Sequence, residues 1–350
     1  MKTFKLLLIC NILLIAISCE KSIELGTEMG SALLIDERSP GFPSLDPGFS
    51  RGMGINNAGV MAGSTRKANG TVVTFKLSHH DLWLSDEEVK PNGLPEIRFT
   101  INDRGDVAGH KSVPGGITPV VWRDGECIEL NVVAGYAYGE VFDINASGVM
   151  VGESLNGNFV TPTAMRATLF SEDGDGIDLG TLGGAKAYAG AINDHGIIVG
   201  GAENAQAQMH AFIYQDGVMT DIGTLGGTIS NANAINNRGQ VVGRSLLSNG
   251  AIRGFLYSDG LMSEIPTLGG ASSVAFDIND RGEVVGFSRV ASGQAHAFLY
   301  KDGVMQDLEI GGIDARAISI NNRGDIIGHY TLADGSVHAF LWSNGEVITL

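Results

Sequence analysis

A stretch near the middle of the chain contains the turns and apolar segments that decide the fold: INNRGQVVGRSLLSNGAIRGFLYSDG, residues 235–260. Asn236 opens an Asn-x-x-Gly turn, in which the asparagine caps the turn and Gly239 adopts a positive φ angle. Asp259-Gly260 is the commonest signal for a two-residue β-hairpin, because both positions need positive φ angles. The apolar segments beside these turns are short and have no helical period, so we expect short antiparallel strands.

The same pattern recurs seven times along the chain. Its asparagines are separated by 46, 43, 48, 43, 43 and 42 residues, and an aromatic residue follows each of them after about 20 residues. These asparagines, to which we assign a structural role in the turns, are Asn56, Asn102, Asn145, Asn193, Asn236, Asn279 and Asn321. Four short strands in about 43 residues are typical of a β-propeller blade. We therefore predict an all-β fold, a seven-bladed β-propeller; a β-helix is the alternative, although its coils are usually shorter.

Three of the aromatic strands carry a His-Ala-Phe triplet, which begins at His210, His296 and His338. Together with the Asn-x-x-Gly-x-Val-Val-Gly hairpin and the Leu-Gly-Gly connections, these triplets resemble the HAF-repeat family of predicted extracellular bacterial repeat proteins. The similarity covers roughly residues 50–350 and departs from the pattern in the first two copies, where Val72-Val73-Thr74 and Pro119-Val120-Val121 replace the triplet. The resemblance implies a repeat architecture and an extracellular location, and it brings no assigned activity.

The N-terminus has the features of a bacterial export signal. Lys2 and Lys5 precede an apolar segment at residues 6–17, which is too short to span a membrane as a helix. The segment ends in Ala-Ile-Ser-Cys at residues 16–19, which resembles the lipobox of bacterial lipoproteins and implies cleavage after Ser18 and a lipid on Cys19. We therefore predict a signal peptide at residues 1–18, a tether at 19–30 and a single propeller domain at 31–350.

The predicted export signal and lipid imply that the membrane is a partner, and they imply a location. We expect the lipid on Cys19 to hold the protein at the outer membrane or cell surface; a secreted or periplasmic soluble protein is the alternative. Two strand-like segments, residues 32–36 and 347–350, are expected to close the ring by pairing in one composite blade.

Composition excludes several classes of protein. Hydrophobic residues make up 43% of the chain and charged residues 18%, which argues against disorder. The net charge of −16 disfavours a nucleic-acid partner, because phosphate binding needs clustered basic residues. The cysteines are Cys10, Cys19 and Cys127, so a mature lipoprotein would contain no intrachain disulfide.

No motif with strong catalytic specificity occurs, so we predict no catalytic residue, metal or cofactor. The histidines of the triplets occupy one equivalent repeat position and are expected to pack between blades rather than to bind a metal. Cys127 has no histidine near it in the sequence and is interpreted as an unreactive thiol.

Basic residues recur within the Asn-x-x-Gly turns and form a candidate anion-binding site. They occupy the second variable position of five turns: Arg104, His195, Arg238, Arg281 and Arg323. Equivalent turns lie on one face of a propeller, so these side chains are expected to form a basic crown, unless the acidic residues close to them in sequence neutralise it.

These observations lead to two functional hypotheses. The first is a binding or interaction scaffold at the cell envelope, with an unidentified protein or glycan partner. The alternative is a propeller enzyme, similar to a lyase or lactonase, with its site in the central channel. An enzyme requires singular acidic or histidine residues near the axis, whereas the polar residues that stand out in the sequence are repeated.

Overall fold

The computed structural model describes residues 45–67, 69–78, 81–86, 99–157 and 162–350. The chain divides into two units, Met1–Leu33 and Leu34–Leu350, and all of the described residues belong to the second. The predicted signal peptide, the tether with Cys19 and the strand-like segment at residues 32–36 therefore lie outside the described residues. The described part of the chain is built of strands and contains no helix that could cross a membrane.

The strands fall into sets of four that are consecutive in the sequence, and neighbouring strands of a set run antiparallel. Sets 1 to 3 consist of β1 (Leu45–Ile55), β2 (Met61–Lys67), β3 (Val72–Leu77) and β4 (Leu82–Leu84); β5 (Thr100–Ile101), β6 (Val107–Val113), β7 (Gly116–Arg123) and β8 (Glu126–Glu129); and β9 (Tyr138–Ile144), β10 (Met150–Gly157), β11 (Pro162–Phe170) and β12 (Ile177–Asp178). Sets 4 and 5 consist of β13 (Gly183–Ile192), β14 (Ile198–Asn204), β15 (Met209–Gln215) and β16 (Val218–Asp221); and β17 (Gly226–Ile235), β18 (Val241–Leu247), β19 (Ile252–Ser258) and β20 (Leu261–Ile265). Sets 6 and 7 consist of β21 (Gly269–Ile278), β22 (Val284–Val290), β23 (Ala295–Lys301) and β24 (Val304–Asp307); and β25 (Asp314–Ile320), β26 (Ile326–Thr331), β27 (Val337–Ser343) and β28 (Glu346–Thr349). The all-β prediction is confirmed.

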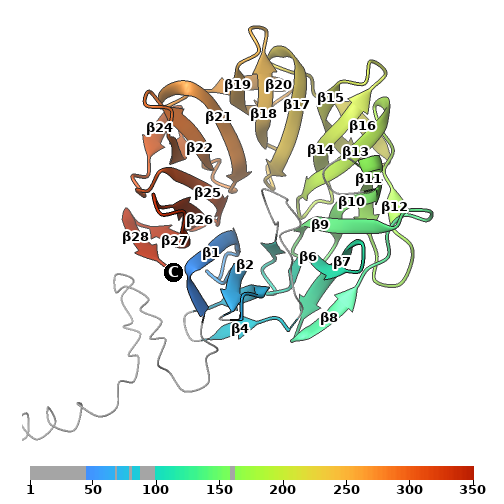
Figure 1. Cartoon of the computed structure of the whole chain (residues 1–350). Helices are drawn as coiled ribbons and strands as arrows, with labels where there is room; N and C mark the ends of the chain where they lie inside the picture. Colours follow the sequence, from blue (N-terminus) through green and yellow to red (C-terminus); the bar gives the residue numbers. More distant parts are fainter. Residues whose placement is uncertain (1–44, 68, 79–80, 87–98, 158–161) are drawn as a thin grey trace, which may run out of the picture. The chain divides into compact units, whose positions relative to one another are not determined.

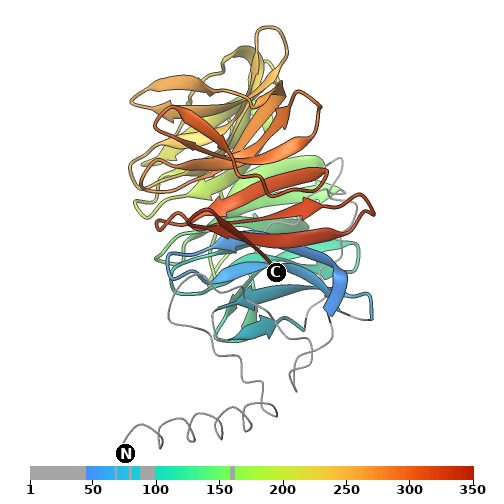
Figure 2. The ribbon, with the colours of Figure 1, turned by 90° about the vertical axis from the view of Figure 1, so that its left-hand side faces the viewer.

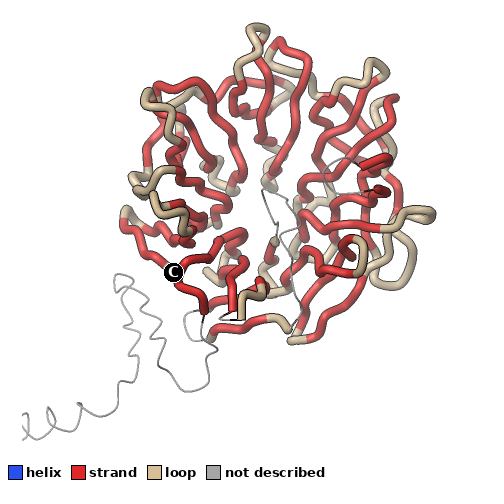
Figure 3. Tube along the Cα trace, viewed as in Figure 1, coloured by secondary structure: helices blue, strands red, loops and turns tan. Residues whose placement is uncertain are grey.

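Both predicted turn types join the strands as expected. In the first turn of set 5, the Oδ1 atom of Asn236 accepts hydrogen bonds from the backbone N–H groups of Arg238 and Gln240, each at 3.0 Å. In the last hairpin of that set, Asp259 and Gly260 have φ angles of 54° and 79°, as a type I′ turn requires. The second unit is thus a series of hairpins connected by loops (Figure 3).

The hydrophobic core lies between neighbouring sets. The phenylalanines at the triplet position, Phe212, Phe255, Phe298 and Phe340, are completely buried. One core cluster joins Val199 and Ala211 of set 4 to Ile235 and Val241 of set 5. The alanine of each triplet lets the next sheet approach closely, because a larger side chain would hold the sheets apart. Face-to-face packing of this kind places the sets around a central axis, with the first strand of each set innermost (Figure 1).

The first and last sets lie side by side. β1 pairs with β27 in parallel through Phe49 and Val337, and the hydroxyl of Ser50 accepts a hydrogen bond from the N–H group of Ala339 at 2.9 Å. Figure 2 shows these strands next to each other.

The expected composite blade is not found among the described strands. β28 folds back onto β27 of its own set, because Asn344 and Gly345 form a tight hairpin with φ angles of 51° and 88°. This hairpin uses one edge of β28, so the pairing of residues 347–350 with residues 32–36 stays a prediction. Its other half, residues 32–36, lies outside the described part of the chain.

Candidate functional site

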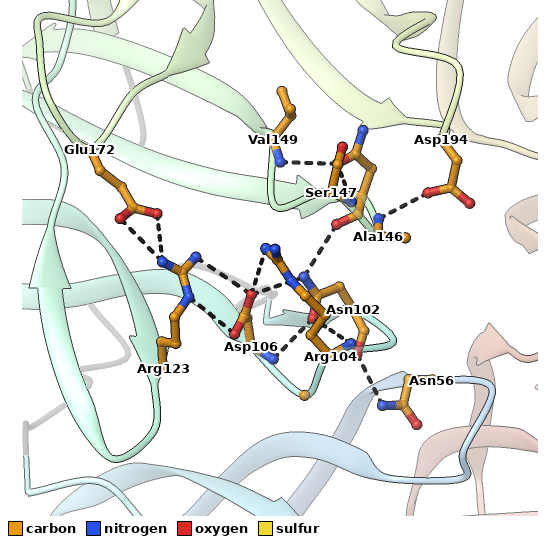
Figure 4. A network of polar contacts seen from close by, with 12 residues as sticks. Asn56, Asn102, Arg104, Asp106, Arg123, Ala146, Ser147, Val149, Glu172 and Asp194 are labelled. Carbon is orange, nitrogen blue, oxygen red and sulfur yellow. Dashed lines mark hydrogen bonds and ion pairs between the residues drawn. The ribbon is translucent and has the colours of Figure 1, made fainter.

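The seven repeat asparagines form a hydrogen-bonded ring at one end of the central channel. The Nδ2 atom of each asparagine donates to the backbone carbonyl of the equivalent asparagine in the next set, at 3.0 to 3.2 Å. The series returns to its start, because Asn321 donates to the carbonyl of Asn56 at 3.0 Å. Figure 4 shows the links made by Asn56 and Asn102. All seven side chains are buried, and their amides hold the sets together at this end.

A second ring of hydrogen bonds lies beside the first and has one gap. In six of the seven sets, an Asn or Asp side chain at the position after the repeat asparagine accepts a hydrogen bond from the equivalent N–H group of the preceding set, as Asp280 does from Asn237 at 2.8 Å. The acceptors are Asn57, Asp103, Asp194, Asn237, Asp280 and Asn322. Set 3 carries Ala146 instead, which has no side-chain oxygen to accept a hydrogen bond. Residues of both rings line a polar cavity of about 170 Å³.

Three of the four arginines in the Asn-x-x-Gly turns form ion pairs with the acidic residue two positions later. Arg104 contacts Asp106 at 2.9 Å, Arg323 contacts Asp325 at 2.8 Å, and Arg281 contacts Glu283 in the same way. Arg123 also binds Asp106, and it links that carboxylate to Glu172 (Figure 4).

The remaining basic residues of the crown differ from these three. Arg238 is followed two positions later by Gln240 rather than by an acid, and the His195 side chain is exposed. The prediction of an anion site on the crown stays a prediction; the ion pairs show that part of its charge is balanced locally.

The triplet histidines make polar contacts within their own set. Nδ1 of His210 lies 2.8 Å from Asp221 Oδ2, and the same contact joins His296 to Asp307 at 2.6 Å. Each histidine is on the third strand and its acid is on the fourth, where an aspartate 11 residues later is within reach. His338 contacts Ser336 instead. Among the described residues, no group of three or more His, Cys, Asp or Glu side chains could hold a metal ion.

The channel also contains a cavity of about 150 Å³, lined largely by the innermost strands. Two half-buried aspartates, Asp143 and Asp277, line it. Each stands two residues before a repeat asparagine. The other five sets have small or hydroxylated residues at that position: Gly54, Thr100, Ala191, Ala234 and Ser319. The two aspartates are therefore singular, unlike the residues of the asparagine ring.

Each aspartate binds a neighbouring set. Asp143 accepts hydrogen bonds from the hydroxyl of Thr100 at 3.1 Å and from the N–H group of Ile192 at 2.9 Å. Asp277 accepts one from the hydroxyl of Ser319 at 2.8 Å and one from the N–H group of Ile320 at 2.9 Å.

Burial in the channel changes the protonation of both carboxyl groups. Burial raises the pKa of Asp143 to about 6, against the hydrogen bonds from Ile192 and Ile144, and the charge of Asp277 raises it further. Burial likewise raises the pKa of Asp277. A carboxyl group whose pKa lies near neutral pH can donate and accept a proton in turn, so this pair is suited to acid–base chemistry.

Neither aspartate belongs to the motif that recurs in all seven sets, so the repeat pattern alone does not identify them. A signal was present: Phe-Asp-Ile-Asn occurs at residues 142–145 and again at 276–279. An alignment of the seven repeats against each other would have shown two acids at a position where the other sets carry none.

No family model and no curated protein matches the chain. Solved structures do. The β-propeller domain of the Trilobed protease from Pyrococcus furiosus matches with a TM-score of 0.57 at 11% identity, over 86% of this chain and 97% of that one. A puromycin-hydrolysing peptidase of Mycobacterium tuberculosis matches with a TM-score of 0.56 at 11% identity, over 88% of this chain and 53% of that one. Pyrococcus horikoshii acylaminoacyl peptidase matches with a TM-score of 0.54 at 13% identity, over 86% of this chain and 52% of that one. The chain spans about half the length of these two peptidases, and the likeness shows that its fold is a β-propeller.

The comparisons correct the expectation of a binding scaffold. The matching structures named above are the propeller domain of a protease and two peptidases, and a puromycin hydrolase also matches. The scaffold prediction depended on a channel without singular acidic residues, and Asp143 and Asp277 occupy that channel. The alternative, a propeller enzyme with a site in the central channel, is the better supported of the two hypotheses.

Proposed function

We propose that the protein is a propeller enzyme of the hydrolase class, with Asp143 and Asp277 as its acid–base pair. One observation carries this proposal: two singular carboxyl groups, both half-buried and both with a raised pKa, line the same cavity in the channel. The charge of Asp277 raises the pKa of Asp143, so ionisation of Asp277 favours the protonated form of Asp143.

A pair in this state supplies both proton transfers of a hydrolysis. The ionised member accepts a proton from the attacking water molecule, and the protonated member donates a proton to the leaving group. Proteins of the same fold are named as peptidases and as a puromycin hydrolase. We therefore propose that the scissile bond is an amide or an ester.

The proposal is tested with chromogenic amides, esters and lactones. Asp143→Asn and Asp277→Asn should each lower kcat/KM by about 100-fold or more, because general acid–base catalysis contributes at least that factor. In Asp143→Asn, the inflection of the pH–rate profile near pH 6 should disappear.

Two controls separate chemistry from structure. Asp194→Asn changes an exposed aspartate outside the cavity and should leave kcat/KM within about twofold. Thr100→Ala removes one hydrogen bond from Asp143 but keeps its carboxyl group, so a much smaller loss is expected. Unchanged turnover in both Asp→Asn variants, or no turnover of any substrate by the wild type, would refute the proposal.

We propose further that the seven sets form the seven blades of a closed ring. The hydrogen bond from Asn321 to Asn56 and the pairing of β1 with β27 support this. We also propose that the protein is exported and anchored through a lipid on Cys19, a proposal that rests on the N-terminal sequence alone. A palmitate analogue should label the wild type and not Cys19→Ala, which should move to the soluble fraction.

A further inference from the structure

A β-bulge in the first strand directs one residue of most sets toward the channel cavity. In β17, Ala232 pairs with Gly243 and Ala234 pairs with Val242, so Asn233 is an extra residue without a partner in the register. A bulge of this kind turns the extra residue out of the regular alternation of the strand. Equivalent bulges occur in sets 1, 3, 4, 6 and 7, and the residue three positions before the repeat asparagine lines the cavity in all seven sets.

Asn233 is the one polar residue at this position. Set 4 carries Gly190, where an added Cβ atom would lie 2.8 Å from the carbonyl oxygen of Ala232, so the backbone of set 5 keeps this neighbouring position free of a side chain. The other five sets carry apolar side chains: Met53, Phe99, Phe142, Phe276 and Ile318. At the bulge position, the cavity therefore has apolar surface from five sets and an amide group from set 5.

Asn233 uses one end of its amide group within the protein. Its Nδ2 atom donates to the backbone carbonyl of Ala275 in set 6 at 2.8 Å. Because a carbonyl can only accept, the NH₂ end must face it, and this assigns the other end to Oδ1. No N–H or O–H group of the described residues donates to Oδ1, and this oxygen is not fully buried. Asn233 therefore offers a hydrogen-bond acceptor in the cavity that it lines.

The same hydrogen bond fixes the amide of Asn233 to the strand that carries Asp277. Ala275 lies two residues before Asp277 on β21. A substrate bound for hydrolysis at the acid–base pair has its leaving group close to this strand. The leaving group of an amide is a nitrogen that carries hydrogen, whereas an ester has an oxygen there, which can only accept.

We propose that Asn233 is a specificity-determining residue that selects amides over esters. Its Oδ1 atom accepts a hydrogen bond from the amide N–H group, while an apolar acyl group packs against the apolar side chains at the bulge position. An ester leaves Oδ1 without a donor and places two acceptor oxygens against each other, which disfavours its binding. This inference rests on the proposed function and narrows its substrate class to amides that carry an N–H group and an apolar acyl group.

Binding of isosteric probes tests the inference without any need for turnover. N-methylbenzamide and propiophenone have the same shape, but propiophenone has a CH₂ group in place of the N–H group. N,N-dimethylbenzamide keeps the amide carbonyl and lacks the N–H group. The phenyl ring suits a cavity of about 150 Å³, since an engineered cavity of that size binds benzene. Calorimetry on the full chain should show N-methylbenzamide binding about fivefold more tightly than either of the other probes.

Two substitutions at position 233 separate the acceptor from the anchor. Asn233→Leu removes the acceptor and should bind N-methylbenzamide and propiophenone equally. Asn233→Asp also loses the amide that donates to Ala275, but it keeps an oxygen that can accept, so it should retain the preference. Asn249→Leu, the matched control, changes an exposed asparagine in a turn of the same set and should leave the preference unchanged.

Two further measurements address folding and turnover. If Asn233→Leu does not fold, the ¹³Cγ resonance of Asn233 in the wild type should move downfield with N-methylbenzamide and less with propiophenone, because accepting a hydrogen bond deshields a carbonyl carbon. With matched chromogenic substrates, Asn233→Leu should lower kcat/KM for the amide relative to the ester by about fivefold.

The outcomes for the two proposals are distinguishable. Equal binding of the probes by the wild type, no binding of N-methylbenzamide, or a preference that survives in Asn233→Leu would overturn the inference, even if the enzyme hydrolyses amides or esters. Loss of the preference in Asn233→Asp as well as in Asn233→Leu would assign Asn233 a purely structural role and would overturn it too. A preference that depends on the acceptor, without any hydrolysis, would uphold recognition of the N–H group and refute only the hydrolase.

Discussion

The two regions of the central channel use polar residues in opposite ways. At one end, seven identical asparagines satisfy one another, because each donor finds its acceptor on the next set. In the adjoining cavity, Asp143 and Asp277 occur where the other five sets carry residues without a carboxyl group. The hydrogen bonds of a repeated residue are satisfied by its equivalents in the neighbouring sets. The hydrogen bonds of a residue that does not repeat depend on the particular residues beside it. Singular polar residues are therefore the better indicator of a site in a repeat protein.

Ionisable groups near the two regions respond to the fold in opposite directions. Burial raises the pKa of Asp143 and Asp277 in the cavity. Burial alone would also raise the pKa of Asp325 beside the asparagine ring, but hydrogen bonds from Ser343, Asn321 and Arg323 together lower it. The fold thus favours a charged carboxylate beside the ring and a protonated one in the cavity.

The largest effect on stability is expected from the asparagine ring. Asn236→Ala removes a donor to the carbonyl of Asn279 and an acceptor for two backbone N–H groups, and it leaves buried polar groups unsatisfied. We expect a loss of about 4 kcal/mol in the free energy of unfolding, measured by urea denaturation.

Asn321 allows the same measurement at the join between the last and first sets. Asn321→Ala should cost about as much as Asn236→Ala if the ring is closed, because its amide binds Asn56. A much smaller cost for Asn321→Ala would show that the ring is open in solution. Costs below about 1 kcal/mol for both variants would contradict a structural role for the ring.

The asparagines show how far the sequence alone can lead. Their turn geometry follows from local chemistry, since Oδ1 of Asn236 binds N–H groups two and four residues later. The repeat number and the all-β fold follow from the spacing of these turns. The Nδ2 hydrogen bonds could not be predicted, because their acceptors are 42 to 48 residues away, or 265 for Asn321, and depend on how the sets pack.

The candidate site was harder to predict for a related reason. Asp143 and Asp277 are about 130 residues apart in the sequence, and only the arrangement of the sets brings them to one cavity. The triplet histidines, by contrast, stand out in the sequence and have local acidic partners in two of three cases.

The next effect separates the cavity from the ring by its dependence on pH. The pKa of Asp143 is about 6 in the folded protein, whereas the ordinary value for an aspartate is 3.8. The folded state therefore keeps this proton to higher pH than the unfolded state does. The contribution of Asp143 to stability is therefore present at low pH and is lost as the pH rises from about 4 through 6. The gap corresponds to about 3 kcal/mol. In urea denaturation, the free energy of unfolding of Asp143→Asn relative to that of the wild type should rise by about this amount between pH 4 and pH 7.

Asp325→Asn should show the opposite trend. Its carboxylate has a lowered pKa in the folded state, so the stability it contributes is present near neutral pH and is lost as the pH falls through that pKa. The deficit of Asp325→Asn relative to the wild type should therefore shrink on acidification. Parallel pH profiles for the wild type and both variants would contradict the assigned directions.

The smallest effect is expected where the repeated region departs from its own pattern. In the second ring, the side chain of Asp103 accepts a hydrogen bond from the backbone N–H group of Asn57. Ala146 occupies the next position of the series and has no side-chain oxygen to accept a hydrogen bond from the N–H group of Asp103. Ala146→Asn supplies that acceptor, and its amide can donate to a neighbouring aspartate, as the amide of Asn237 does to Asp194 and Asp280. Asparagine is preferred to aspartate here, because a further negative charge between Asp103 and Asp194 would be repelled. Position 146 is exposed, so the gain should be about 0.5 to 1 kcal/mol, seen as a small rise in the melting temperature. Ala146→Ser, whose shorter side chain carries no amide, should give less, and a loss of stability in the asparagine variant would mean that the gap is a constraint of set 3 rather than an unfilled position.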